Sequence, residues 1–157
     1  MRTPRSLILG LAGAALTATV VTAASHAPDP APAIKARQAQ MQLYAFNLGT
    51  LGAMAQEKMP YDAAMASTAA NNLAALAKLD QSMMWPAGSD ADSAEGSRAL
   101  PEIWANFEDV AAKGQAMRDA ADAMAAAAGT DLASLQAAMG PLGGSCGGCH
   151  KPYRAPE

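Results

Sequence analysis

Five residues near the C-terminus, Cys146-Gly147-Gly148-Cys149-His150, constrain this chain more than any other part of its sequence. Two thiols separated by two residues and followed at once by an imidazole are typical of a covalent haem attachment site. Residues three and four apart lie on one face of a helix, so both thiols can reach one porphyrin and the imidazole can turn onto its iron. The motif predicts a helix that carries one haem c through Cys146 and Cys149, with His150 as the proximal iron ligand.

Three other uses of the two thiols remain open at this point. A zinc site needs four protein ligands, or three and an open position, and the chain has only two Cys and two His. A redox-active dithiol needs a strand–helix context, and no strand pattern lies nearby. A structural disulfide would leave the spacing and the following His150 unexplained. Covalent haem is therefore the favoured interpretation.

The N-terminus has the pattern of a secretory leader. Arg2 and Arg5 precede an apolar run from Leu7 to about Ala24, and small residues follow. This pattern predicts that residues 1–27 are a cleaved signal peptide, the alternative being an uncleaved membrane anchor. Residues 28–33 are then expected to be a mobile, Pro-rich lead-in, and residues 34–157 a single cytochrome domain.

The composition excludes some partners and favours helices. The 157-residue chain has a net charge of −3 and no run of Lys or Arg, which argues against nucleic-acid binding. Beyond the leader no stretch is apolar enough to span a bilayer, so no membrane contact is expected after cleavage. Ala is very common and strand-favouring residues are few, a composition typical of closely packed helices.

Four segments show apolar residues at helical spacing. They begin near Ile34, after Pro60, after Pro101 and after Thr130, which is expected to cap the fourth. These segments predict an all-α fold, an antiparallel up-down four-helix bundle with covalent haem near its C-terminal end. Inward faces of the middle two segments are expected to include Met65, Met83 and Phe107. In the fourth segment both thiols are predicted to point inward, because they belong to its apolar stripe. This stripe consists of Leu135, Met139, Leu142, Cys146, Cys149 and Tyr153.

The second axial position of the iron cannot be filled by another histidine in the mature domain. Cleavage at residue 27 removes His26 and leaves only His150. Met41 lies on the inward stripe of the first helix, at the end of an antiparallel bundle where the haem motif would face it. It is either a distal iron ligand or ordinary core filling, the usual role of Met at helical spacing.

The chain also resembles the class II c-type cytochromes, the cytochrome c′ family. Besides the haem motif, the matching pieces are Arg37-Gln38 with Met41, Ile103-Trp104-Ala105-Asn106, and Tyr153-Arg154. The resemblance implies that Arg37 lies near a haem propionate, Trp104 lines the haem pocket, Arg154 approaches the proximal imidazole, and Met41 faces the iron. The non-functional alternatives are that Arg37 is a solvated charge, that Trp104 is an ordinary core residue, and that Arg154 is a charge at a frayed terminus. Pro152 departs from the family pattern and predicts a kink or an end in the last turn.

The family resemblance implies two functions. In its low-spin branch, which this chain resembles more, a first-helix Met binds iron and the protein carries electrons between redox partner proteins. In the other branch the iron is five-coordinate and binds NO or CO, with Met41 as an uncoordinated lid. An enzyme is not expected, because no distal acid–base group accompanies Met41. The resemblance also implies export to the periplasm of a Gram-negative-type cell and a homodimer through the first two helices.

Overall fold

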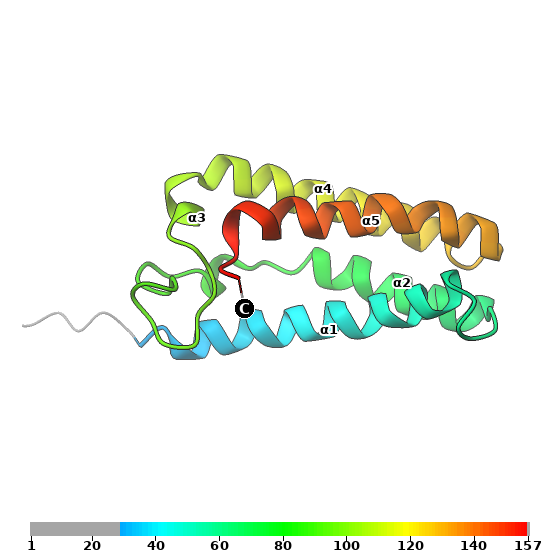
Figure 1. The fold of residues 1–157 in the computed structure, drawn as a ribbon, viewed down its shortest axis with the longest axis horizontal. Coiled ribbons are helices and arrows are strands. Elements are labelled where there is room, and N and C mark those ends of the chain that lie inside the picture. The colour runs from blue at the N-terminus through cyan, green and yellow to red at the C-terminus, as the bar shows by residue number, and fades with distance from the viewer. Residues whose placement is uncertain (1–28, 157) are drawn as a thin grey trace, which may run out of the picture.

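The computed structural model describes residues 29–156, so the predicted signal peptide lies outside the described residues. Figure 1 shows two layers of antiparallel helices, one made by the first two long helices and the other by the last two. Within residues 29–156 the backbone forms no strand, only an isolated bridge between Ala99 and Arg154. The predicted antiparallel four-helix bundle is confirmed. Its elements are α1 (Ala31–Ala55), α2 (Ala63–Ala77), the 3-10 turn η1 (Ser82–Met84), α3 (Glu102–Ala105), α4 (Phe107–Ala127) and α5 (Leu132–Tyr153).

The long helices do not pack equally closely on one another. Among neighbouring long helices, packing is most extensive between α4 and α5, less so between α2 and α4 and then between α1 and α2, and least extensive between α1 and α5. The bundle is therefore closed on three sides and least filled along the seam between α1 and α5. Both thiols are carried on one side of this seam and Met41 on the other.

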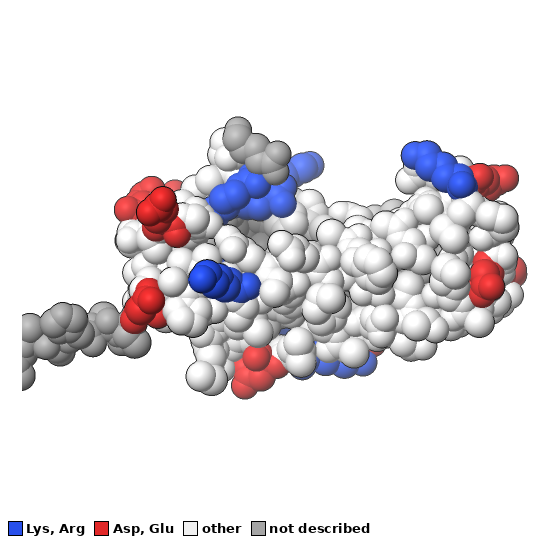
Figure 2. All heavy atoms as spheres, turned by 90° about the horizontal axis from the view of Figure 1, so that it is seen from below, with Lys and Arg blue, Asp and Glu red and all other residues white. Residues whose placement is uncertain are grey.

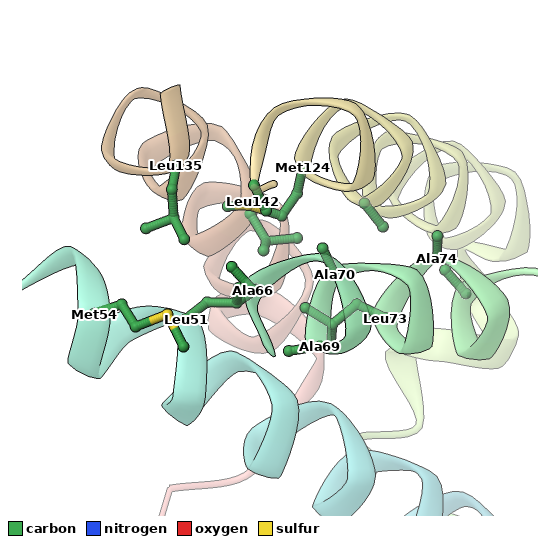
Figure 3. Close-up of a cluster of buried hydrophobic side chains, with 13 residues drawn as sticks. Leu51, Met54, Ala66, Ala69, Ala70, Leu73, Ala74, Met124, Leu135 and Leu142 are labelled. Carbon is green, nitrogen blue, oxygen red and sulfur yellow. The ribbon is translucent and has the colours of Figure 1, made fainter. Parts of the chain in front are cut away.

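The core is built from a few large aliphatic side chains set among alanines. Small Ala side chains let the helices approach closely, and the larger residues fill the centre. Figure 3 shows this arrangement, with α2 contributing mostly alanines. The largest fully buried hydrophobic side chains are Leu51, Met54, Leu73, Met124, Leu135 and Leu142.

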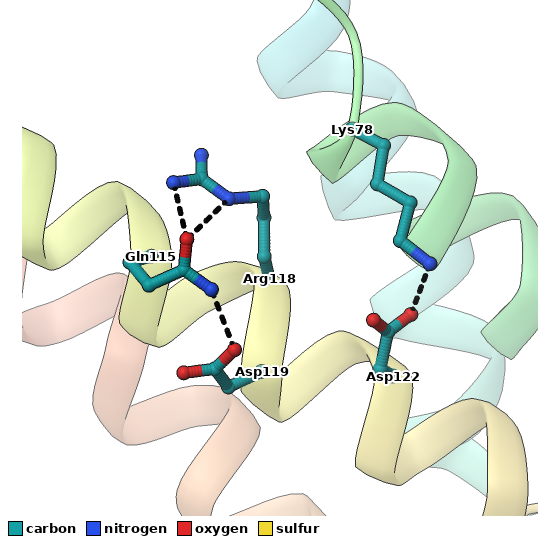
Figure 4. Close-up of polar contacts among 5 residues, drawn as sticks. All are labelled: Lys78, Gln115, Arg118, Asp119 and Asp122. Carbon is teal, nitrogen blue, oxygen red and sulfur yellow. Dashed lines mark hydrogen bonds and ion pairs between the residues drawn. The ribbon is translucent and has the colours of Figure 1, made fainter.

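Polar contacts on the surface add little to this packing. Lys78 Nζ lies 2.6 Å from Asp122 Oδ1 and joins the end of α2 to α4, with both side chains about half exposed. Arg118 donates to Gln115 Oε1 one turn away on α4, as Figure 4 shows. Exposed pairs of this kind contribute at most about 1 kcal/mol each. Apolar burial therefore dominates the stability of the bundle.

Two helix starts differ from the sequence prediction. α1 begins at Ala31, three residues before Ile34, so the second half of the expected lead-in at 28–33 is helical. Pro32 is compatible with this start, because the first turn of a helix needs no internal N–H donor. Asp131, and not Thr130, caps α5: its backbone is extended and its carboxylate accepts from Ser134 N at 2.7 Å.

The middle of the chain departs further from the prediction. α2 ends at Ala77, and the third segment is broken at Asn106 into α3 and α4, where the backbone leaves helical angles (φ −126°, ψ 43°). Phe107 follows this break and is 67% exposed, and Met83, beyond the end of α2, is 88% exposed. Met65 lies in the first turn of α2, where Ala66 fills the core, and is 45% exposed. The inward positions predicted for these three residues are wrong.

α5 continues through two prolines. Pro141 and Pro152 both lie inside the helix, which ends at Tyr153, one residue beyond Pro152. The last turn therefore ends close to the predicted place, but Tyr153 remains helical and buried.

Candidate functional site

The two thiols of the haem motif are free and half-buried in the last two turns of α5. Burial raises the pKa of Cys146 and of Cys149 above the usual value for a thiol. Both are therefore neutral thiols at pH 7, one helical turn apart. Among residues 29–156 no three His, Cys, Asp or Glu side chains lie close enough together to hold a metal ion, as a protein-ligated zinc site would require.

His150 directly follows the second thiol and is also half-buried. Burial lowers the pKa of its imidazole, and the nearby positive charges of Arg154 and Arg98 lower it further. The ring is thus held in the neutral form, which is the form that binds metals. Arg154 is exposed but close enough to influence the imidazole electrostatically, and its role beside a haem ligand stays a prediction.

Contacts at one end of the seam define how α1 lies against α5. Gln136 Nε2 donates to Ala55 O at 2.9 Å. Three residues further back along α1, a side chain added at Gly52 would begin 3.8 Å from Met139 Cε. Each step back along α1 is therefore matched by an equal step forward along α5.

The same register brings Met41 to the level of the haem motif. Tyr44 lies close enough to Cys146 for that thiol to contribute to raising the tyrosine pKa, although burial is the main cause. Met41 precedes Tyr44 by three residues, so the two share a face of α1. Continuing the register by three residues puts Met41 at the level of Cys149 and His150 along the bundle axis, and a contact between them stays a prediction. The Met41 side chain is 39% exposed, in contrast to the fully buried Met residues of the core.

Arg37 lies one turn before Met41 and is 5% exposed, so the alternative of a solvated charge is wrong. Its Nη1 donates to Met84 O at 3.1 Å and to Ser89 Oγ at 2.8 Å, and its Nη2 donates to Ser97 Oγ at 2.8 Å and to Ser89 O. The guanidinium also lies 4.6 Å from the ring centre of Trp85. Four of its five N–H groups thus hold the loop between α2 and α3, and Nε is the donor left for a propionate.

Trp104 on α3 stands in a small cluster beside the second thiol. Its Nε1 donates to Trp85 O at 3.2 Å, and the two indole rings meet edge to face with centres 6.2 Å apart. Cys149 packs against the same cluster, which is centred on Ala99, Ile103 and Tyr153. Trp104 is therefore a neighbour of the haem motif, and its role in lining the pocket stays a prediction.

The donor set and the open seam together fit a covalently held haem. Two neutral thiols one turn apart precede a neutral imidazole on α5, which packs less extensively on α1 than on α4. Side chains added at Gly147 or Gly148 would meet nothing within 4 Å, so the backbone of the motif is not crowded by other helices. Cys146 and Cys149 would hold the porphyrin by thioether bonds, and the iron would supply one-electron redox chemistry.

An all-helical bundle with this motif in its last helix defines a bundle-type c-type cytochrome. A family model described as Cytochrome C' matches residues 32–154, and this chain belongs to the cytochrome c′ family, with one covalently attached haem c. It is 52% identical to cytochrome c-554 of Cereibacter sphaeroides over 121 residues, which are 77% of this chain and 91% of that relative.

Solved structures agree with this assignment. Cytochrome c prime from Shewanella frigidimarina superposes with a TM-score of 0.75 at 40% identity and covers 83% of this chain and 100% of its own. A cytochrome c′ with ligand-controlled dimer dissociation gives a TM-score of 0.73 at 30% identity, covering 83% of this chain and 99% of its own. The likeness therefore extends over nearly the whole described bundle.

Sequence reasoning missed two polar residues near the motif. Tyr44 shares the face of Met41, and its position one turn further along α1 is the signal that could have identified it. Asp109 accepts a hydrogen bond from Tyr153 Oη at 2.6 Å. Nothing in the local sequence distinguishes Asp109 from the other acids of α4, so only the fold reveals this contact.

Proposed function

We propose that this protein is a periplasmic electron carrier in which His150 and Met41 are the two axial ligands of a single haem c. The observation that carries the proposal is the register between α1 and α5, which extrapolates to the level of Cys149 and His150 at Met41. The shared face of Met41 and Tyr44, and the electrostatic influence of Cys146 on Tyr44, support it. Thioether ligation opposite histidine raises the haem potential and suits electron transfer.

The same arrangement argues against an enzyme. A haem peroxidase needs a distal acid or base close to the iron. α1, which carries Met41, contains no Asp, Glu or His. The helix that carries Met41 therefore offers no carboxylate or imidazole for peroxide cleavage, and redox partner proteins are the proposed physiological reactants.

The decisive experiment replaces Met41. In the ferric wild type we expect the weak red-edge absorption band of methionine-ligated low-spin iron, and in Met41→Ala we expect this band to disappear. The ferrous variant should also bind CO, which the wild type should not. Met83→Ala is the matched control, because Met83 is 88% exposed and lies beyond the end of α2. A wild type without the band, with a spectrum unchanged by Met41→Ala, would contradict the proposal.

The second candidate is a five-coordinate protein that binds NO or CO. Its supporting observation is the 39% exposure of Met41, which fits a side chain that covers the distal side without binding iron. The resemblance to a cytochrome c′ with ligand-controlled dimer dissociation points the same way. Rapid CO binding by the ferrous wild type, equal to that of Met41→Ala, would favour this candidate.

Export is part of the proposal. Residues 1–27 have the pattern of a secretory leader. In the described part of the chain, no helix is both long and apolar enough to cross a membrane. Covalent haem attachment at such a motif is completed outside the bacterial cytoplasm, so the periplasm is the compartment in which the mature protein is expected.

We also propose a homodimer through α1 and α2. α2 carries no charged residue, and the two on α1 are Lys35 and the buried Arg37. Figure 2 shows a face of the molecule on the α1 side with charges near both ends and few across its broad middle. A shallow groove of about 340 Å³ between α1 and α2 adds shape to this surface. The exposed large apolar residues on and next to these two helices include Leu43, Phe46, Met65 and Leu79.

Two phenylalanines allow a matched test of the dimer. Phe46 on α1 is 73% exposed and Phe107 on α4 is 67% exposed. A charge at Phe46 would be buried without a partner in the proposed interface, whereas a charge at Phe107 would stay in water. In sedimentation equilibrium we expect Phe46→Glu to shift the protein to monomer and Phe107→Glu to behave as wild type. Equal masses for both variants would argue against this interface.

A further inference from the structure

The last turn of α5, which carries His150, is weakly supported by its own sequence. Pro152 lies inside this turn and has no backbone N–H to donate to the carbonyl of Gly148. Side chains added at Gly147 or Gly148 would meet nothing within 4 Å, so neither residue packs the turn against a neighbour. Such a turn needs support from other elements to hold His150 in one orientation.

The first support is a short antiparallel pairing between the segment before α3 and the segment after α5. Leu100 N donates to Tyr153 O at 3.0 Å, and Ala155 N donates to Arg98 O at 2.9 Å. The Arg98 guanidinium also donates to Ala155 O, at 2.7 Å from Nη2. These bonds hold the backbone that leaves α5 and prevent the last turn from unwinding freely.

The second support is a side-chain hydrogen bond between α5 and α4. Tyr153 Oη donates to Asp109 Oδ2 at 2.6 Å, and the tyrosine is 7% exposed in the cluster that also contacts Cys149. Lys113 Nζ lies 3.5 Å from the same carboxylate oxygen. Hydrogen bonds to an ionised carboxylate are stronger than neutral ones, so this contact is a firm tie between the two helices.

We infer that Asp109 and Tyr153 are positioning residues for the proximal ligand: their hydrogen bond fixes the last turn of α5 against α4 and so sets the plane of the His150 imidazole. Tyr153 follows His150 by three residues, so their side chains lie on the same side of the helix. Arg154 N donates to His150 O at 3.1 Å and keeps the turn closed. The inference rests on the proposed role of His150 as an iron ligand and does not depend on Met41.

The test measures the orientation of the imidazole directly. In ferric low-spin haem proteins the spread of the haem-methyl proton shifts depends on the plane of the axial imidazole, and cyanide gives the low-spin state if the iron is high-spin. Tyr153→Phe keeps the buried ring and removes only the hydroxyl. We expect this variant and Asp109→Ala to change the spread of the shifts in the same way, and the double variant to add no further change.

Two controls separate positioning from general stability. Tyr61→Phe also removes a tyrosine hydroxyl, one that donates to Ala128 O at 2.9 Å at the other end of the bundle. Lys113→Met removes the neighbouring cation but keeps the tyrosine–carboxylate bond. Both controls should retain the wild-type shifts even where they lower the thermal midpoint.

Three results would overturn the inference. Wild-type shifts in Tyr153→Phe would show that the hydroxyl does not orient the ligand. A change of equal size in Tyr61→Phe would show that any loss of stability disturbs the haem. A wild type without hyperfine-shifted His150 protons would overturn the ligand role itself, and the inference with it.

Discussion

At the scale of single residues, the start of α2 depends on one carboxylate. Asp62 has an extended backbone, and its Oδ1 accepts from Met65 N at 2.8 Å. Asp62→Ala leaves that N–H without an acceptor, so we expect the free energy of unfolding to fall by about 1 kcal/mol. Urea denaturation of the holoprotein measures this change. Asp62→Asn keeps an acceptor oxygen and should lose much less, and neither variant should alter the haem spectrum.

Helix caps also show what the sequence could not decide at this scale. Thr130 and Asp131 are both residues that cap helices well, and the sequence favoured the first. The structure uses Asp131, because its backbone adopts the extended conformation (φ −163°, ψ 170°) that a cap requires. That conformation is set by how α4 ends and turns, which depends on tertiary contacts. Cys146, Cys149 and His150, in contrast, were predictable because their spacing alone carries the chemistry.

At the scale of elements, the turn between α4 and α5 lies unusually close to α2. A side chain added at Gly129 would begin 2.0 Å from Ser67 Oγ, 3.4 Å from Ser67 Cβ and 3.5 Å from Ala63 O. Gly129→Ala should therefore force the Ser67 hydroxyl out of its position and lower the free energy of unfolding by roughly 1–3 kcal/mol, the usual cost of overpacking.

The contact with Ser67 offers a test of this explanation for Gly129. The closest clash is with the hydroxyl oxygen, so Ser67→Ala should recover part of the loss when it is combined with Gly129→Ala. Urea denaturation of the two single variants and the double variant gives the coupling. Strictly additive changes would show that the cost has another origin, such as the backbone of the turn.

Element boundaries in the middle of the chain were the hardest to predict. The third apolar stripe continues across Asn106, but the structure breaks there and places Phe107 in solvent. The long loop before α3 is held by Arg37 through Ser89 and Ser97. Contacts so distant in sequence leave no periodic pattern, and the burial of Arg37 could not be predicted from its neighbours on α1.

At the scale of the whole molecule, the topology was predictable and the register of the seam was not. Four amphipathic segments, with short connections apart from the loop before α3, leave few arrangements other than an up-down bundle. How far α1 slides along α5 depends on pairs such as Ala55 with Gln136, which the sequence does not single out. The level of Met41 along α5 could therefore be inferred only with the fold.

The alkaline stability of the bundle should depend on the tie between α4 and α5. The hydrogen bond from Tyr153 to Asp109 raises the pKa of Tyr153 to about 12. Because the folded pKa lies above the ordinary value near 10, the tyrosine's contribution to stability is fully present below about pH 10. It is lost as the pH rises through about 12, where the folded protein must give up the proton. A bundle of this size is expected to unfold as one unit, so the loss should appear in the global transition.

Urea midpoints of wild type and Tyr153→Phe, measured from neutral pH to about pH 12, test this linkage. Below about pH 10 the wild type should be more stable than the variant by a constant amount, because the hydrogen bond is intact throughout that range. Above about pH 10 the urea midpoints of wild type and Tyr153→Phe should converge, since only the wild type has a Tyr153 phenol proton to lose. Parallel curves for wild type and Tyr153→Phe up to the highest pH would show that Tyr153 does not govern alkaline stability.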